Sequence, residues 1–254
     1  MTASNRPTTW TSSIEMLKRL QTVALYTSLL SGPIPEEIGN CSELQNLYLY
    51  QNSITGPIPK RIGELEKLQE SVAVTVMDFS ENLLASQIPK SFGELSNLQE
   101  LQLSVNQLSG TIPSEISNCT ALTHLEVDNN DMSGEILALI GNLKGLTLFF
   151  AWQNKLTGNI PESLSYCQNL QGLDLSYNNL FGSIPRNVFG LQNLTKLLLL
   201  SNNLSGFIPP DIGNCTNLYR LRLNHNRLSG TVPLEIGNLK SLNFVDLSNN
   251  RLVG

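Results

Sequence analysis

The stretch Leu-Tyr-Arg-Leu-Arg-Leu-Asn-His-Asn-Arg-Leu-Ser-Gly, residues 218–230, decides the fold of this chain. It follows the pattern L-x-x-L-x-L-x-x-N-x-L-x-G, and its alternation of apolar and polar residues indicates a short strand. Successive side chains of a strand point to opposite faces, so Leu221 and Leu223 face inward. Arg220 and Arg222 occupy the intervening positions and point outward from the same face. Two guanidinium groups two residues apart are suited to bind an anion.

The same pattern recurs along the chain. With the first leucine of each coil as position one, coils start at residues 20, 44, 74, 98, 122, 146, 170, 194, 218 and 242. From Val74 onward every step is 24 residues, a period within the range of leucine-rich repeats. The sequence therefore predicts a leucine-rich-repeat solenoid of about ten repeats, in which stacked coils pair their short strands into one parallel sheet.

We expect the plant-type 24-residue form of this solenoid, a right-handed superhelix with a concave parallel β-sheet and a mostly irregular or 3-10 convex side. The run Gly-x-Ile-Pro after the turn, as in residues 206–209, is typical of that form. Its glycine permits a tight turn, and its proline favours an extended backbone before it. The asparagine at position nine, as in Asn226, should satisfy backbone groups of the turn and of the neighbouring coil.

Residues 14–254 are predicted to form a single solenoid, preceded by a disordered tail over residues 1–13. The repeat slips once, because the coil due at residue 68 starts at Val74. Residues 68–73 therefore form an irregular insertion, and Ser86 stands where every other coil has glycine. Neither end shows an atypical capping repeat, so we expect the solenoid to be uncapped at both ends.

Composition and motifs argue against several classes of function. A net charge of −5 argues against nucleic-acid binding, which depends on a basic surface. No stretch approaches the roughly 18 consecutive apolar residues of a membrane-spanning helix. Phosphate-binding loops, nucleophile elbows, zinc-binding spacings and kinase signatures are absent. We therefore expect a chain without enzymatic activity, metal, cofactor, nucleic-acid partner or membrane segment.

Cysteines replace a core leucine at position 22 of four coils. They are Cys41, Cys119, Cys167 and Cys215. No two lie in adjacent coils, and two coils separate their side chains by roughly 10 Å, which is beyond the reach of a disulfide. We therefore predict four buried free thiols. The two histidines, His124 and His225, are four coils apart and cannot share a metal ion.

Five Asn-x-Ser/Thr sequons are candidates for N-glycosylation. They lie at Asn40, Asn118, Asn193, Asn203 and Asn214. A chain this rich in Asn, Ser and Thr contains about that number by chance, so the sequons alone do not assign a compartment.

The outward positions of successive strands predict a graded concave surface. Its members are Tyr26, Tyr48 and Tyr50; an acidic band of Asp78, Glu81, Glu100, Glu126 and Asp128; then Phe150, Trp152, Asp174 and Tyr177; and last Lys196, Leu198, Leu200, Arg220 and Arg222. Exposed aromatic side chains beside two arginines favour a binding surface. We interpret Glu126, Asp128 and Asp174 as solvated acidic residues rather than as a catalytic pair. As an alternative to ligand binding, Asp246 in the next coil could occupy Arg222 as a cross-strand partner.

Three stretches carry a resemblance to a known family. They are residues 47–52 (Leu-Tyr-Leu-Tyr-Gln-Asn), 149–161 (Phe-Phe-Ala-Trp-Gln-Asn-Lys-Leu-Thr-Gly-Asn-Ile-Pro) and 219–224 (Tyr-Arg-Leu-Arg-Leu-Asn). Together with the plant-type repeat, they make residues 14–254, except 68–76, closely similar to ectodomains of plant leucine-rich-repeat receptor kinases of subfamily XI. Among these, the chain most resembles the receptors for root meristem growth factor peptides.

That resemblance implies a function. In the family an Arg-x-Arg pair on the inner face holds the free C-terminal carboxylate of a short secreted peptide hormone, and the pair corresponds here to Arg220 and Arg222. Further peptide contacts are expected from Phe150, Trp152, Asp174, Lys196 and Leu198. The resemblance also implies a co-receptor leucine-rich-repeat kinase and a location at the extracellular face of the plasma membrane.

Other features of that family have no counterpart in this sequence. These are the signal peptide, the flanking cysteine caps, the transmembrane helix, the cytoplasmic kinase and an Arg-x-Gly-Gly element that reads the sulfated part of the peptide. Two alternatives therefore stay open. One is a kinase-less defence protein, similar to polygalacturonase inhibitors, that binds a whole protein partner. The other is a non-functional truncated gene product, which the missing caps and the slip at residue 68 favour.

Overall fold

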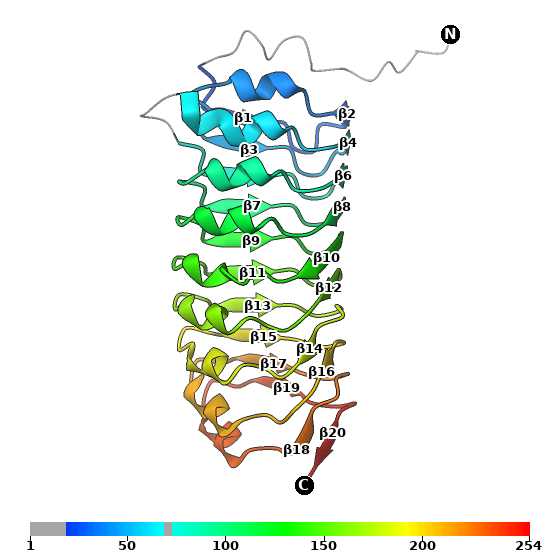
Figure 1. Cartoon of the computed structure of the whole chain (residues 1–254), viewed down its shortest axis with the longest axis vertical. Coiled ribbons are helices and arrows are strands. Elements are labelled where there is room, and N and C mark those ends of the chain that lie inside the picture. Colours follow the sequence, from blue (N-terminus) through cyan, green and yellow to red (C-terminus); the bar gives the residue numbers. More distant parts are fainter. Residues whose placement is uncertain (1–18, 69–72) are drawn as a thin grey trace, which may run out of the picture.

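The computed structural model describes residues 19–68 and 73–254. These residues form a stack of coils along one axis, with the N-terminal coil at one end and the C-terminal coil at the other (Figure 1). The predicted tail at 1–13 and residues 69–72 of the predicted insertion lie outside the described residues.

One parallel sheet runs the length of the stack, and its outward side is the concave face. Its ten strands pair in chain order. They are β1 (Thr22–Ala24), β3 (Asn46–Tyr48), β5 (Val76–Asp78), β7 (Glu100–Gln102), β9 (His124–Glu126), β11 (Leu148–Phe150), β13 (Gly172–Asp174), β15 (Lys196–Leu198), β17 (Arg220–Arg222) and β19 (Phe244–Asp246). Each strand covers positions three to five of its coil, and Asn46 pairs with Val76 across the slip. The strands therefore keep equivalent positions of successive coils in register on both sides of the slip.

A second set of strands follows the turns, between positions 10 and 14 of the coils. A six-stranded parallel sheet contains β2 (Ser31–Pro33), β4 (Ser53–Gly56), β6 (Leu83–Ser86), β8 (Gln107–Gly110), β10 (Asp131–Glu135) and β12 (Lys155–Thr157). Two further pairs are β14 (Phe181–Gly182) with β16 (Asn203–Leu204), and β18 (Ser229–Thr231) with β20 (Arg251–Val253). These strands form a second edge of the stack beside the concave sheet (Figure 1).

The return path of each coil is a 3-10 helix, which confirms the predicted convex side. The helices are η3 (Glu36–Asn40), η4 (Lys60–Leu68), η5 (Lys90–Glu94), η6 (Ser114–Asn118), η7 (Ile140–Asn142), η8 (Glu162–Tyr166), η9 (Arg186–Gly190), η10 (Pro210–Asn214) and η11 (Leu234–Asn238). Proline fixes the extended backbone before most of them, as Pro113 does before η6. In η7, where Leu137 replaces this proline, only three residues are helical.

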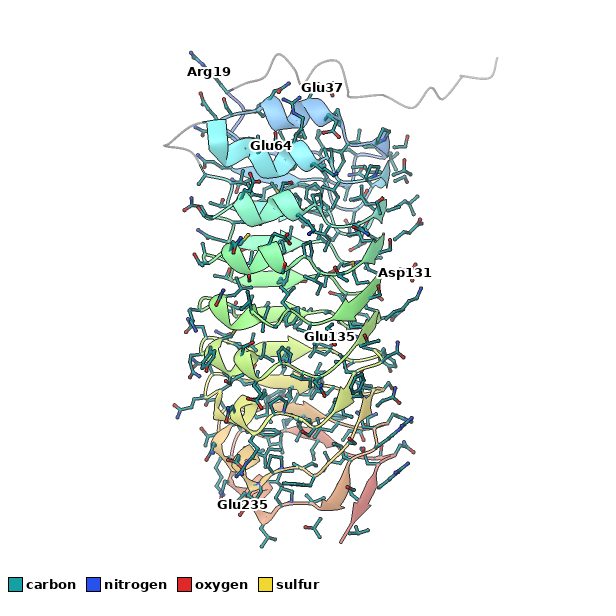
Figure 2. All side chains as sticks on the ribbon, in the orientation of Figure 1. Arg19, Glu37, Glu64, Asp131, Glu135 and Glu235 are labelled. Atoms are coloured by element: carbon teal, nitrogen blue, oxygen red, sulfur yellow. The ribbon has the colours of Figure 1, made fainter. Side chains whose placement is uncertain are left out.

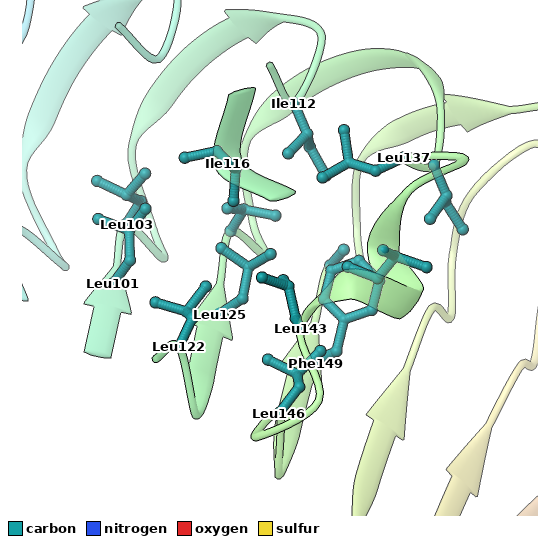
Figure 3. Close-up of a cluster of buried hydrophobic side chains, with 14 of the residues drawn as sticks. Leu101, Leu103, Ile112, Ile116, Leu122, Leu125, Leu137, Leu143, Leu146 and Phe149 are labelled. Atoms are coloured by element: carbon teal, nitrogen blue, oxygen red, sulfur yellow. The ribbon is translucent and has the colours of Figure 1, made fainter. Parts of the chain in front are cut away.

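The core lies between the concave sheet and the helices. Leu125 of β9, Ile116 of η6 and Leu122 between them have no exposed surface, and their side chains meet in the interior of the coil (Figure 3). Burying one such side chain contributes about 1.5–3 kcal/mol relative to leaving it exposed. Charged side chains such as Asp131 and Glu135, at the two ends of β10, lie on the outside (Figure 2).

A ladder of asparagines joins each coil to the previous one. Asn226 accepts a hydrogen bond from the Leu204 N–H and donates to the carbonyl oxygens of Leu199, Leu223 and Asn224. The same arrangement recurs at Asn178 and Asn202. The predicted structural role of position nine is therefore confirmed. Just before it, position eight is left-handed in every coil, with φ between 51° and 56°, and this conformation ends the strand.

Candidate functional site

The strand register aligns the predicted binding residues in two rows across the concave face. At position five, Phe150 pairs with Asp174, Asp174 with Leu198, Leu198 with Arg222, and Arg222 with Asp246. At position three, Lys196 pairs with Arg220 and Arg220 with Phe244. Trp152 extends this region at position seven of the Phe150 coil. Adjacent strands lie about 4.8 Å apart, so these residues form one continuous region, which we call the C-terminal concave surface.

Arg220 and Arg222 both lie against the ring of Phe244. Their guanidinium carbons are 5.3 Å and 5.8 Å from the ring centroid, within the range of a cation–π interaction. Arg220 is exposed, and 34% of the Arg222 side chain is exposed. The two guanidinium groups are therefore close in space as well as in sequence, and solvent or a ligand can reach both.

Asp246, the alternative partner of Arg222, is held mainly by its own coil. Its Oδ1 accepts hydrogen bonds from the N–H and the hydroxyl of Ser248 at 3.1 Å and 2.7 Å. Its Oδ2 lies 3.8 Å from Arg222 Nη2, which is too long for a hydrogen bond. The Ser248 hydrogen bonds, aided by the charge of Arg222, lower the pKa of Asp246. Asp246 is therefore ionised at neutral pH but leaves the hydrogen-bonding capacity of Arg222 unused.

Asp174 lies two strands from Arg222 on the side away from Asp246. Burial raises the pKa of Asp174, whereas a hydrogen bond from the Ser176 N–H and the positive charge of Arg222 oppose that rise. The Arg222 guanidinium is therefore attracted from both sides by carboxylates that do not accept a hydrogen bond from it among the described residues.

The apolar part of this surface lies deeper than predicted. Of the three aromatic residues predicted here, Phe150 and Trp152 are half-buried, and Tyr177 is 52% exposed. The placement of Leu200 on the open surface is wrong, because only 4% of it is exposed. Ser176 and Asn224, its neighbours at position seven, are similarly covered. Near the two arginines, position seven is therefore a recessed row, formed by Ser176, Leu200 and Asn224.

The acidic band is also more buried than a solvated face would be. Asp128 is only 5% exposed, so its interpretation as a solvated residue is wrong, and Asp78 is similarly covered at 9%. Asp128 accepts a hydrogen bond from the Ser104 hydroxyl at 2.7 Å. Burial, with the charges of Asp128, Asp78 and Glu100, raises the pKa of Glu126 to about 6. This part of the concave face therefore holds crowded carboxylates, and a cationic group bound there would reduce the repulsion between them.

The other predicted positions lie away from the concave surface or inside the coil. Asn118, Asn193 and Asn214 are exposed, while Asn40 and Asn203 are partly buried. The side-chain amide of Asn193 donates to the Gln168 carbonyl. All four cysteines are buried and none forms a disulfide, as predicted. Among the described residues, His, Cys, Asp and Glu side chains form no group that could hold a metal ion, and no helix is long and apolar enough to span a membrane.

Three residues at this site were missed when the sequence was considered alone. Phe244 holds both arginines, and Asn224 lies beside Arg222 in the recessed row. Gly172 gives room to an aromatic side chain, since a Cβ there would come within 2.9 Å of Leu148 and 3.1 Å of the Phe150 ring. Comparing the same position in every coil would have found them. Gly172 is the only glycine at position three, and Asn224 is the only asparagine at position seven.

Comparisons with known proteins place this geometry in context. Two models described as leucine-rich repeat match the chain, one over residues 73–132 and the other over 43–65, 169–191, 193–215 and 217–239. A search of curated proteins finds no match.

Solved structures give closer parallels. The chain is 68% identical to a plant peptide hormone receptor, RGFR1, solved in complex with RGF2, with a TM-score of 0.84 over 95% of this chain. It is 39% identical to the Arabidopsis receptor kinase HAESA, solved with the peptide hormone IDA and the co-receptor SERK1, with a TM-score of 0.88 over 94% of this chain. It spans 42% and 40% of those two chains. A plant ice-binding protein is 30% identical, with a TM-score of 0.77 over 89% of this chain and 70% of that one.

Proposed function

This chain belongs to the leucine-rich-repeat family, and from that premise we propose that its concave face binds a short secreted peptide hormone. In this proposal the free C-terminal carboxylate of the peptide lies between Arg220 and Arg222. Phe150, Trp152, Asp174, Lys196 and Leu198 contact the preceding residues. The similarity to RGFR1, solved in complex with RGF2, supports a peptide ligand.

The observation that carries the proposal is that the two guanidinium groups are held in place while their hydrogen-bond donors stay unused. Both are held over Phe244, yet neither makes a hydrogen bond to another described residue, and the ion pair of Arg222 with Asp246 is 3.8 Å long. Guanidinium groups bind carboxylates through short, often paired hydrogen bonds. Two oriented guanidinium groups with unused donors are therefore a site prepared for a carboxylate from outside the chain.

The length of the concave face sets the size of the ligand. Ten strands make nine steps of about 4.8 Å, roughly 43 Å in all, and an extended peptide covers about 3.3 Å per residue. A peptide of about a dozen residues fits along it. With its C-terminus at Arg220 and Arg222, its middle lies against Phe150, Trp152 and the acidic band. Its N-terminus points towards the N-terminal coils.

The cellular setting follows from the same similarities. Because HAESA was solved with a co-receptor as well as a peptide, we infer that a co-receptor kinase is a second partner of this protein. Such binding takes place at the extracellular face of the plasma membrane. The leucine-rich-repeat part serves recognition, without a catalytic role of its own.

Calorimetry on this chain tests the carboxylate contact. The RGF2 peptide is titrated with a free C-terminus and with a C-terminal amide into the unmodified chain, Arg220→Ala and Arg222→Ala. Each charge-assisted hydrogen bond contributes roughly 1.5–3 kcal/mol, so either substitution, or amidation, should lower affinity at least tenfold. Arg222→Ala combined with amidation should lower the affinity little more than either change alone, because both remove the same contact.

The control is Arg227→Ala, an exposed arginine of the same coil beyond the turn. It changes the net charge equally and should leave affinity unchanged. Additive losses, or no loss from either arginine substitution, would show that the carboxylate lies elsewhere. If the peptide does not bind at all, a whole-protein partner becomes the better explanation of the concave face.

A further inference from the structure

Asn224 carries an unsatisfied polar atom beside the two arginines. Only 3% of the residue is exposed, and its side-chain oxygen Oδ1 has neither solvent contact nor a hydrogen-bond partner among the described residues. The same holds for Nε of Arg222. An acceptor and a donor, two residues apart at the end of β17, are thus both without partners among the described residues.

Of the other polar residues at position seven, the Ser176 hydroxyl is likewise buried without a partner among the described residues, whereas other serines there have one. The Ser80 hydroxyl donates to Asp78 and the Ser248 hydroxyl donates to Asp246, in each case the position-five carboxylate of the same coil. In the Asn224 coil, position five is Arg222, which cannot accept a hydrogen bond. A buried acceptor without a partner is rare in native proteins, and here the neighbouring residues do not supply one.

The apolar surroundings of Asn224 Oδ1 make it selective for a ligand that supplies a hydrogen-bond donor. Leu200 occupies the same position in the adjacent coil and is 4% exposed, and Leu198 pairs with Arg222 across the strands. The Asn224 amide therefore borders an apolar floor. In such a place a hydrogen bond is electrostatically stronger than in water, and an unpaired polar group is correspondingly costly.

We propose that Asn224 is a second recognition point of the peptide site, reading the last peptide N–H of the ligand while Arg220 and Arg222 hold its carboxylate. This inference rests on the proposed function. The Asn224 Oδ1 accepts the amide N–H of the C-terminal residue, and Arg222 Nε donates to the adjacent carboxylate oxygen. The Cα atoms of Arg222 and Asn224 are about 6.6 Å apart along the strand, so their side chains can converge on the two ends of one ligand residue.

The proposal defines the class of ligand. The site takes a peptide whose C-terminal residue has both a free carboxylate and a secondary amide N–H. It discriminates against a C-terminal proline, which has no N–H, and against any N-alkylated last residue. A simple carboxylate such as acetate satisfies the arginines but leaves Asn224 without a partner, and it should bind far more weakly.

A double-mutant cycle tests this reading. The RGF2 peptide, with its last amide either free or N-methylated, is titrated by calorimetry into the unmodified chain and into Asn224→Ala. We expect N-methylation to weaken binding to the unmodified chain about five- to tenfold and Asn224→Ala to weaken binding of the free-amide peptide by a similar factor. The two changes combined should lower the affinity little more than one change alone, because both remove the same hydrogen bond.

Two comparisons keep the outcomes distinct. If N-methylation lowers the affinity equally for the unmodified chain and for Asn224→Ala, its effect is conformational and the role of Asn224 is refuted. Suppose that neither N-methylation nor Asn224→Ala lowers the affinity, while Arg222→Ala and C-terminal amidation still do. The carboxylate site is then supported and only the proposed role of Asn224 is refuted. Loss of all peptide binding by the unmodified chain overturns the proposed function itself. The titrations on the unmodified chain need no variant, so they remain informative if Asn224→Ala folds poorly.

Discussion

Arg222 Nη2 lies 3.8 Å from Asp246 Oδ2, a separation that allows an ion pair but no hydrogen bond. The same chain builds a much tighter pair elsewhere. On the convex side, Nε and Nη2 of Arg186 donate to Asp211 Oδ2 at 3.0 Å and 2.8 Å. The contrast indicates that Asp246 attracts Arg222 without occupying its hydrogen-bond donors.

Removing the charge of Asp246 should therefore strengthen binding. Asp246 attracts Arg222 and repels a ligand carboxylate, and an exposed ion pair contributes about 0.2–1 kcal/mol. We expect Asp246→Asn, which retains an acceptor for Ser248, to raise the affinity for the free-carboxylate RGF2 peptide by roughly 1.5- to fivefold in calorimetry. Asp211→Asn makes the same change in net charge on the opposite side and should leave affinity unchanged. Weaker binding by Asp246→Asn would mean that Asp246 orients Arg222 for the ligand.

The crowded carboxylates should make stability fall as the pH rises. Burial and three acidic neighbours raise the pKa of Glu126 from 4.5 to about 6. Between these values the folded state holds more protons than the unfolded state, so this contribution to stability is present below pH 4.5 and is lost as the pH rises through 6. Glu126→Gln should raise the melting temperature at pH 7.5 and leave it almost unchanged at pH 4. Glu135→Gln, an exposed glutamate on β10, should show no such difference between the two pH values.

Ser86 adopts a backbone conformation that the other coils give to glycine. Its φ is 79°, and the equivalent glycines have φ between 76° and 84°. A residue with a side chain is strained there by about 1–3 kcal/mol, and glycine loses about 0.5–1 kcal/mol more backbone entropy on folding. Ser86→Gly should therefore raise the free energy of unfolding by about 1 kcal/mol in denaturant titration. Ser109→Gly, in the neighbouring coil at an ordinary strand position, should lower it. Destabilisation by Ser86→Gly would show that the serine side chain is needed for packing.

The four cysteines should stay reduced and unreactive in the folded protein. All are buried, and burial raises the pKa values of the Cys167 and Cys215 thiols to about 11. Because the thiolate is the reactive form, a thiol reagent should label none of the cysteines under native conditions and all four in denaturant. Rapid labelling of the native chain would contradict the burial of position 22.

The amino-acid sequence alone is enough to assign the repeat frame and the features that follow from equivalent positions in the repeat. A 24-residue period places equal positions of successive coils side by side, so the neighbours Arg220 and Phe244, or Arg222 and Asp246, are known once the coils are aligned. Alternation along a strand decides which side chains face outward. The asparagine ladder and the buried cysteines follow for the same reason, because each position has one environment that every coil repeats.

How deep each outward side chain lies, and which atoms contact each other, depends on the packing of the coils in three dimensions. Leu200 and Asp128 point towards the concave face by pattern, yet the side chains of adjacent coils cover them. The ring of Phe244 holds two arginines because side-chain rotamers bring them there, and strand alternation says nothing about rotamers. The unpaired Oδ1 of Asn224 depends on the absence of a partner within a few ångströms. Position in a repeat gives adjacency, whereas hydrogen bonds and burial depend on the size and conformation of every neighbouring side chain.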